Sequence, residues 1–423
     1  MNVLVVSQYF HPEVGATQTR MFEFARALAD EGHAVDVLTE FPNHPAGIIP
    51  ASYAGRWIEF DSSLPFRVVR VWVVTSPEKN LRTRLAFYGS FLLMCLAASF
   101  RLRGRYDVVA ATSPPLPAAL AGLLIARLKR AAFVLDVRDL WPLAAGALKE
   151  LSSPRAYRWA ERLEQYLYRN ADRITVTTRA FVRHVTAADP RRAGRTVHVP
   201  NGTVASLFDP GRGDDGVRER LGLRDSFVVT YAGLHGVAQD LSTMLCAAER
   251  LRTQSGVQFL MIGEGPLKES LKEEAQSRNL TSVRFHEQVP LDRSAYFLNA
   301  SDVLVVPLVA DSVFKMFVPS KLFDAMACAK PVILMVDGEA RDLLDEADAG
   351  IFVPPGDADK LAEVILALAG DPDRCRAMGE RGRAFVLRHY VRSEQARLFA
   401  TVLRDAVESR GQAQAQVVAG ARR

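Results

Sequence analysis

Lys321 and its neighbours carry the most specific chemical signal in this sequence. The run Pro319-Ser320-Lys321-Leu322-Phe323-Asp324 reads as the start of a helix, because proline and serine favour the first helical positions. Free amides and the Lys321 ammonium would then converge at the helix N-terminus and attract an anion. Asp324, one turn after Ser320, could accept hydrogen bonds from a ribose diol. A capped helix with exposed charges is the alternative.

Glycines end two strand-like runs in the second half of the chain. One run ends in Tyr231-Ala232-Gly233 and the other in Gly263-Glu264-Gly265-Pro266. Open α/β sheets bind ligands at the carboxyl ends of their strands. We therefore predict that a nucleotide base or ribose presses on the backbone at Gly233, Gly263 and Gly265, with simple turns as the alternative.

Gly15 lies in a similar turn near the N-terminus, between an apolar run and an amphipathic stretch. A glycine there lets backbone amides approach a phosphate at the start of a helix. The turn lacks G-x-G-x-x-G, so a dinucleotide cofactor is disfavoured. A plain strand-to-helix turn explains the pattern equally well.

Short apolar runs alternate with helical segments along the chain, which is typical of parallel sheets with crossover helices. In the first half the runs are Val3–Ser7, Ala34–Thr39, Phe66–Val73, Asp107–Ala111, Ala132–Asp136, Arg173–Thr177 and Val197–Val199. In the second half they are Phe227–Ala232, Gln258–Ile262, Val283–His286, Val303–Val306, Pro331–Leu334 and Gly350–Val353. At 423 residues the chain exceeds one ordinary core, so we predict an α/β protein with two Rossmann-like domains.

The turn-prone triplet Pro200-Asn201-Gly202 marks the domain boundary. We predict an N-terminal domain over 1–200 and a C-terminal domain over 201–385. A helix over 386–411 would pack back on the first domain, and 412–423 would form a disordered tail.

Composition favours a globular protein of the reducing cytoplasm. The four cysteines are far apart and lack C-x-x-C spacing, and the N-terminus lacks the basic start of a signal peptide. A net charge of +5 over 423 residues is too small and too diffuse to predict nucleic-acid binding. The eight histidines are scattered, so we expect no metal and no cofactor.

The segment Leu85–Phe100 is nearly all apolar and has arginines on both sides, at positions 82, 84, 101, 103 and 105. Its sixteen residues fall short of the roughly 20 needed to span a bilayer. A buried core helix and a helix lying in the membrane surface are the two main interpretations.

Taken together, the order of these motifs resembles the retaining GT-B glycosyltransferases of family 4, in which two Rossmann-like domains face a donor cleft. The resemblance rests on Tyr-Ala-Gly, Gly-Glu-Gly-Pro, Pro-Ser-Lys-Leu-Phe-Asp and the following Ala-Met-Ala-Cys-Ala-Lys-Pro-Val-Ile. Pro42-Asn43-His44-Pro45-x-Gly47 and Arg138-Asp139-Leu140-Trp141-Pro142 resemble the branch that builds bacterial surface polysaccharides, including N-acetyl-fucosamine transferases.

The resemblance implies roles for individual residues. Asp324 takes the position of the family's ribose-binding glutamate, and Met316 stands where a second glutamate is usual. The family's phosphate pair is absent, so Lys321, with Lys315 as a second candidate, would neutralise the diphosphate. Further donor contacts would come from Gly15, Gly233, Gly263, Glu264, Gly265, Pro319, Ser320 and Leu322, and acceptor contacts from His44, Arg138 and Trp141.

The residues that could do acid–base chemistry are few. Many relatives place a histidine after the fourth strand, where this chain has Thr112-Ser113-Pro114-Pro115. Asp139 is the remaining candidate, with a helix cap or an ion pair to Arg138 as the alternative. Retention needs no enzyme nucleophile if the leaving diphosphate takes the acceptor proton, with Lys321 stabilising it.

The resemblance therefore implies transfer of a sugar, an N-acetylated hexose or deoxyhexose, from a nucleotide diphosphate donor with UDP as the nucleotide. A lipid-linked or saccharide acceptor at the inner face of the cytoplasmic membrane would receive it, with peripheral contact to anionic lipid. A nucleotide-sugar 2-epimerase on the same fold is one alternative, and would need acidic and histidine groups around the sugar ring. A non-catalytic binding module is the other.

Overall fold

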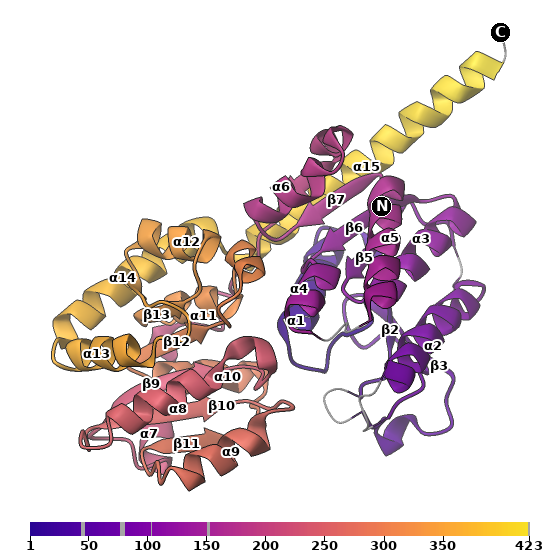
Figure 1. Ribbon diagram of the computed structural model, residues 1–423. Coiled ribbons are helices and arrows are strands. Elements are labelled where there is room, and N and C mark those ends of the chain that lie inside the picture. The colour runs from indigo at the N-terminus through magenta and orange to yellow at the C-terminus, as the bar shows by residue number, and fades with distance from the viewer. Residues whose placement is uncertain (44–46, 77–80, 103, 150–152, 422–423) are drawn as a thin grey trace. The chain divides into compact units, whose positions relative to one another are not determined.

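The computed structural model describes residues 1–43, 47–76, 81–102, 104–149 and 153–421, arranged in two compact units (Figure 1). One unit is Met1–Pro200 with Ser393–Arg423, and the other is Asn201–Arg392. The chain thus crosses between the units after Pro200 and after Arg392, where the sequence analysis had placed boundaries after 200 and 385.

The first unit is built on a sheet of strand order β3-β4-β2-β1-β5-β6-β7-β8. The strands are β1 (Asn2–Val6), β2 (Ala34–Glu40), β3 (Ile58–Asp61), β4 (Arg67–Val71), β5 (Val108–Ser113), β6 (Ala132–Val137), β7 (Arg173–Val176) and β8 (Thr196–His198). The helices are α1 (Ala16–Asp30), α2 (Leu81–Ser99), α3 (Leu116–Lys129), α4 (Trp141–Ala147), α5 (Pro154–Asn170), α6 (Arg179–Ala187) and α15 (Arg392–Ala421), with short 3-10 turns at Ala51–Tyr53 and Pro190–Arg195. All neighbouring strands are parallel except β3 and β4.

The second unit is built on a parallel sheet of order β11-β10-β9-β12-β13-β14. Its strands are β9 (Phe227–Ala232), β10 (Val257–Ile262), β11 (Val283–His286), β12 (Val303–Pro307), β13 (Val332–Met335) and β14 (Gly350–Phe352). Its helices are α7 (Val217–Arg220), α8 (Leu241–Arg250), α9 (Lys268–Ser277), α10 (Leu291–Asn299), α11 (Lys321–Ala327), α12 (Glu339–Ala347), α13 (Ala358–Ala369) and α14 (Pro372–His389), with 3-10 turns at Pro210–Arg212, Val237–Gln239 and Ser312–Met316. The predicted pair of Rossmann-like α/β domains is confirmed.

Apolar residues on alternate sides of the strands create cores on both faces of each sheet. In the second unit, Val229 and Tyr231 of β9 belong to the core under α8 and α13, while Val228 faces the opposite core. In both sheets the strand order reverses once, between β1 and β5 and between β9 and β12. Ligands of such sheets bind at the carboxyl ends of the strands beside this reversal.

Helix α15 completes the core of the first unit. Phe399 stacks on Phe24 of α1 with ring centres 4.6 Å apart, and Leu403 and Ala406 are fully buried. The helix begins at Arg392 and continues to Ala421, so the segment predicted as a disordered tail is helical as far as Ala421.

Helix α2 contains the apolar segment with arginine flanks and lies on the surface of the first unit. One side buries Phe91, Cys95 and Ala98 completely. The other side exposes Leu85 and Leu93 by 64% and 67%, and Phe100 just after the helix by 76%. The segment is therefore not the fully buried core helix of one interpretation. Among the described residues no helix is long and apolar enough to cross a membrane.

Candidate active site

Lys321 reaches from the first turn of α11 to the loop that follows β9, beside the strand-order reversal of the second sheet. Its ammonium donates a hydrogen bond of 2.8 Å to the Tyr231 hydroxyl and lies 3.9 Å from the centre of that ring. A Cβ atom added to Gly233 would come within 2.6 Å of the same nitrogen. The glycine thus leaves room for the cation, and desolvation lowers the pKa of Lys321 to about 7.

The other two glycines are needed for the packing of the protein backbone. A Cβ on Gly263 would lie 1.9 Å from the carbonyl oxygen of Gly233, and one on Gly265 would lie 2.4 Å from that of His235. We predicted that a nucleotide base or ribose presses on the backbone at these glycines, and the space that an added side chain would occupy holds the protein's own backbone. They bring the ends of β9 and β10 together, which leaves only their backbone for a ligand.

The partly exposed Glu264 and the fully buried His235 adjoin these glycines. The Glu264 carboxylate pairs at 2.5 Å with Lys268, whose side chain is only 5% exposed. Burial, followed by the charge of Lys268, lowers the pKa of the fully buried His235 to about 4. The imidazole is therefore neutral at physiological pH, and the predicted donor contact Glu264 already has a cationic partner.

Asp324 lies close to Thr203, near the first residue of the second unit, and to Arg392, the last residue of that unit. Its carboxylate accepts a hydrogen bond of 2.8 Å from the buried hydroxyl of Thr203. The backbone of Thr203 in turn exchanges 2.9 Å hydrogen bonds with Tyr390 and Arg392. Burial raises the pKa of Asp324 to about 6, although Arg392 opposes this shift. The hydrogen bond to Thr203 was not expected from the sequence.

Compared with Lys321, the other residues of the Pro319–Leu322 segment are less well placed for side-chain contacts to a donor. Pro319 and Ser320 are partly exposed, but the Ser320 side chain makes no capping hydrogen bond to α11. Leu322 is fully buried in the core, so its predicted donor contact can come only from the backbone. Helix α11 has seven residues and begins at Lys321, whose ammonium brings a positive charge to its first turn.

The first unit places Arg138 and Asp139 after β6, near the start of α4. Arg138 donates to the carbonyl of Pro114 at 2.5 Å and to the hydroxyls of Thr17 and Thr112, so it joins three segments of the carboxyl edge. Burial raises the pKa of Asp139, and Arg138 opposes that shift. In the described part of the chain no hydrogen bond to the Asp139 carboxylate is found, which keeps its oxygens available as acceptors.

Other predicted residues of this edge are only partly defined. Gly15 precedes α1 with an extended backbone, and its carbonyl accepts from the amide and hydroxyl of Thr19. Trp141 begins α4 and is partly exposed. His44 lies outside the described residues.

A buried polar network at the ends of β1 and β2 was missed by the sequence analysis. The carboxylate of Glu40 accepts from the side-chain amides of Gln8 at 2.8 Å and Asn43 at 2.7 Å, and burial raises its pKa. The Asn43 backbone amide donates to Glu13. The sequence analysis identified the Pro-Asn-His-Pro motif, but the spacing of its residues did not indicate that Asn43 binds the Glu40 carboxylate.

Within the described ranges, no group of three or more histidine, cysteine or acidic side chains is arranged to hold a metal ion. The four cysteines are unpaired, and three of them are buried.

Comparison with protein families gives two matches, one for each unit. The glycosyl transferase 4-like domain matches residues 15–202, and glycosyl transferases group 1 matches residues 226–371. Both units therefore match glycosyltransferase families, and the chain is a glycosyltransferase with the GT-B fold.

Individual relatives agree with this assignment. The glycosyltransferase is 30% identical over 244 residues to a Pseudomonas aeruginosa protein named "Probable glycosyltransferase WbjE", over 55% of this chain and 58% of that relative. Its fold is similar to that of sucrose-phosphate synthase from Thermosynechococcus elongatus, with a TM-score of 0.76, 21% identity, and coverage of 96% and 99% of the two chains. It is also similar to HepE of Anabaena, solved in complex with UDP-glucose, with a TM-score of 0.71, 18% identity, and coverage of 96% and 100%.

Proposed function

We propose that this glycosyltransferase moves an N-acetylated hexose or deoxyhexose from a UDP-linked donor with retention of configuration and without a metal ion. The observation that carries the proposal is the Lys321 ammonium, held beside Gly233 where the sheet reverses its strand order. In a desolvated setting the protonated Lys321 interacts strongly with a diphosphate, and the diphosphate in turn favours the protonated form. The HepE complex with UDP-glucose supports UDP as the nucleotide.

The proposed reaction uses the donor itself as the base. The bond between the sugar C1 and the phosphate oxygen breaks, and the acceptor oxygen bonds to C1 on the same face. The proton of the acceptor hydroxyl passes to the leaving phosphate. Lys321 stabilises the negative charge that grows on this phosphate, so neither a nucleophile nor a metal is required from the protein. Asp139 serves as an acceptor-side carboxylate that orients the incoming hydroxyl.

The proposed acceptor is a saccharide carried on a polyprenyl diphosphate in the synthesis of a cell-surface polysaccharide. The support lies in α2, whose outer side exposes Leu85, Leu93 and the adjoining Phe100. Exposed arginines at positions 82, 101 and 105 lie close to the same segment along the chain. Apolar side chains beside cations suit an anionic membrane surface, with the arginines at the lipid phosphates. The protein would then act as a peripheral protein at the inner face of the cytoplasmic membrane.

A thermal-shift screen of nucleotide sugars tests the donor assignment. A donor at about 100 times its Kd stabilises the folded protein by about 2.7 kcal/mol, which is measurable as a raised Tm. We expect UDP and UDP-N-acetylhexosamines to raise Tm in wild type and the shift to shrink in Lys321→Ala. Lys360→Ala is the matched control, because Lys360 is a surface lysine of α13 that pairs with Glu363. Stabilisation by guanosine or adenosine diphosphates alone would contradict the choice of UDP.

A further inference from the structure

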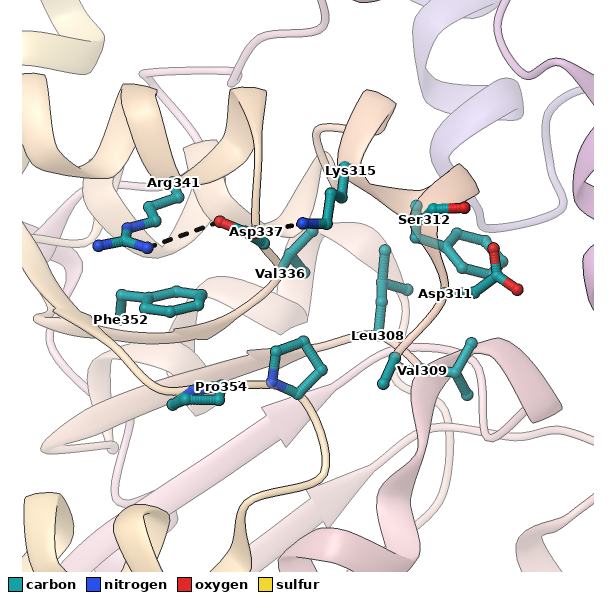
Figure 2. Close-up of a pocket in the computed structure, with 13 residues that line it drawn as sticks. Leu308, Val309, Asp311, Ser312, Lys315, Val336, Asp337, Arg341, Phe352 and Pro354 are labelled. Atoms are coloured by element: carbon teal, nitrogen blue, oxygen red, sulfur yellow. Dashed lines mark ion pairs between the residues drawn. The ribbon is translucent and has the colours of Figure 1, made fainter.

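A separate cavity of about 450 Å³ opens at the carboxyl edge of the second sheet (Figure 2). It is lined by the segments that follow β12, β13 and β14, whereas Lys321 lies toward β9 on the other side of β12. Among the described residues that line it, only Lys315 was considered for the donor site. The volume falls within the ~300–1,000 Å³ typical of small-ligand sites.

Ion pairs and close backbone packing hold the walls of this cavity together. Asp337 lies between Lys315 at 2.7 Å and Arg341 at 3.6 Å, as the dashed lines in Figure 2 show. A Cβ on Gly338 would come within 2.2 Å of the Lys315 carbonyl oxygen, so the turn after β13 sits directly against the Ser312–Met316 segment. The cavity is therefore formed before any ligand arrives.

The charges of the lining argue against an anion. Lys315 and Arg341 supply two cations, and Asp311 and Asp337 supply two carboxylates, so the lining is neutral as a whole. Arg341 also lies 3.5 Å from Asp345, which further reduces its attraction for an added negative charge. Hydroxyl groups can donate to the carboxylates and accept from the cations at once, whereas the carboxylates repel the charge of an anion.

The rest of the lining is apolar and suits the C–H faces of a sugar ring. Phe352, Pro354 and Val309 are among the lining side chains in Figure 2. The Arg341 guanidinium covers the Phe352 ring at 4.2 Å, which keeps the aromatic side chain and the cation in a fixed relation. We propose that this cavity is a second saccharide-binding site, which holds a short neutral segment of a glycan outside the site of sugar transfer.

Saturation-transfer difference NMR on the full-length protein tests the proposal, with UDP present to occupy the donor site. The probes are maltose, cellobiose and diacetylchitobiose, each up to about 20 mM, and inorganic phosphate followed by its own phosphorus signal. The variants are Phe352→Ala and Arg341→Gln. The matched controls are Leu366→Ala, a 40% exposed leucine on α13, and Arg376→Gln, a 68% exposed arginine on α14.

We expect at least one disaccharide to receive saturation from wild type, with Kd raised about tenfold or more in Phe352→Ala and Arg341→Gln and unchanged in both controls. The UDP affinity of every variant is measured on the same samples. It shows, independently of disaccharide binding, whether the donor site and the fold are intact. The proposal is overturned if no disaccharide binds, if the four variants bind alike, or if phosphate binds in their place with dependence on Arg341. It does not require UDP to be the natural nucleotide.

Discussion

The Lys321 ammonium donates to the Tyr231 hydroxyl at 2.8 Å, and that hydroxyl donates onward to the Leu234 carbonyl at 2.7 Å. This chain of two hydrogen bonds joins the first turn of α11 to the loop after β9. Among the described residues, the cation beside Gly233 has this one neutral hydrogen-bond partner and no carboxylate partner. A cation held in this way is preorganised for an anionic ligand.

The pKa of about 7 for Lys321 predicts that UDP affinity depends on pH. The phosphate binds the charged ammonium, so the Kd for UDP should rise as pH increases through about 7. Below that pH Lys321 is already protonated, so UDP binding should take up fewer protons there than at higher pH. The measurement is calorimetry between about pH 6 and 8.5 in buffers of different ionisation enthalpy. In Tyr231→Phe the ammonium loses its acceptor, so the rise in Kd should begin at lower pH. A Lys360→Ala profile that matches wild type is the control.

Asp324→Asn should raise the free energy of unfolding and weaken UDP binding. A pKa raised to about 6 means that the folded state holds this proton more tightly than the unfolded state, so stability is lost as pH rises from about 4 through 6. The asparagine oxygen can still accept from Thr203, so the variant should gain roughly 1–2 kcal/mol at about pH 8 and nothing near pH 4. Chemical denaturation at both pH values measures this gain.

The same Asp324→Asn protein should bind UDP more weakly, while Asp324→Glu should retain binding because it keeps a carboxylate. Wild-type affinity in the asparagine variant would show that the carboxylate serves the Thr203 contact alone.

Gly263→Ala should damage the site through the backbone. The added Cβ would meet the Gly233 carbonyl at 1.9 Å, and φ of 141° is costly for any other residue. We expect a loss of about 2–4 kcal/mol in the free energy of unfolding together with weaker UDP binding. Gly256→Ala, just before the same strand, has open space around its Cβ and should change stability by less than about 0.5 kcal/mol. Equal stability of the two variants would contradict the packing seen at β9 and β10.

Much of the fold was predictable because strands of a parallel sheet are apolar on both faces. The runs Phe227–Ala232 and Val283–His286 coincide with β9 and β11. The edge strand β3 (Ile58–Asp61) escaped notice, since it is antiparallel, partly exposed and carries two acidic residues among its four. Hydrophobic pattern alone does not identify such a strand.

The site was predictable only where a motif is contiguous in the chain. Lys321 and Asp324 stand in one helical run, but their partners Tyr231 and Thr203 are 90 and 121 residues away. Tyr231 lies inside an apolar strand, where a tyrosine is expected to be part of the core. Thr203 directly follows the turn-prone triplet at the domain boundary. Such pairings depend on how the helices and strands pack, and the spacing of residues within a motif does not show this.

Helix α2 should bind anionic membranes reversibly. Changing Arg101, Arg103 and Arg105 to Gln removes roughly 1 kcal/mol per arginine, so co-sedimentation with anionic liposomes should fall strongly at low salt. Changing Leu85, Leu93 and Phe100 to Ser should reduce binding at every salt concentration. Arg224, Arg252 and Arg376, exposed in the second unit, changed together to Gln, provide a control of equal charge. Equal partitioning of all these proteins, or none at any salt, would remove the membrane proposal.

The most direct test of the account follows the donor by proton NMR as the enzyme consumes it. Without a dedicated acceptor, water accepts the sugar slowly, and the first free sugar to appear reports the stereochemistry before mutarotation. The account predicts release of UDP with a sugar of the same anomeric configuration as the donor, about 100-fold slower in Lys321→Ala and unchanged in Lys360→Ala. An inverted sugar, a 2-epimer, or a donor that stays intact in wild type would contradict it.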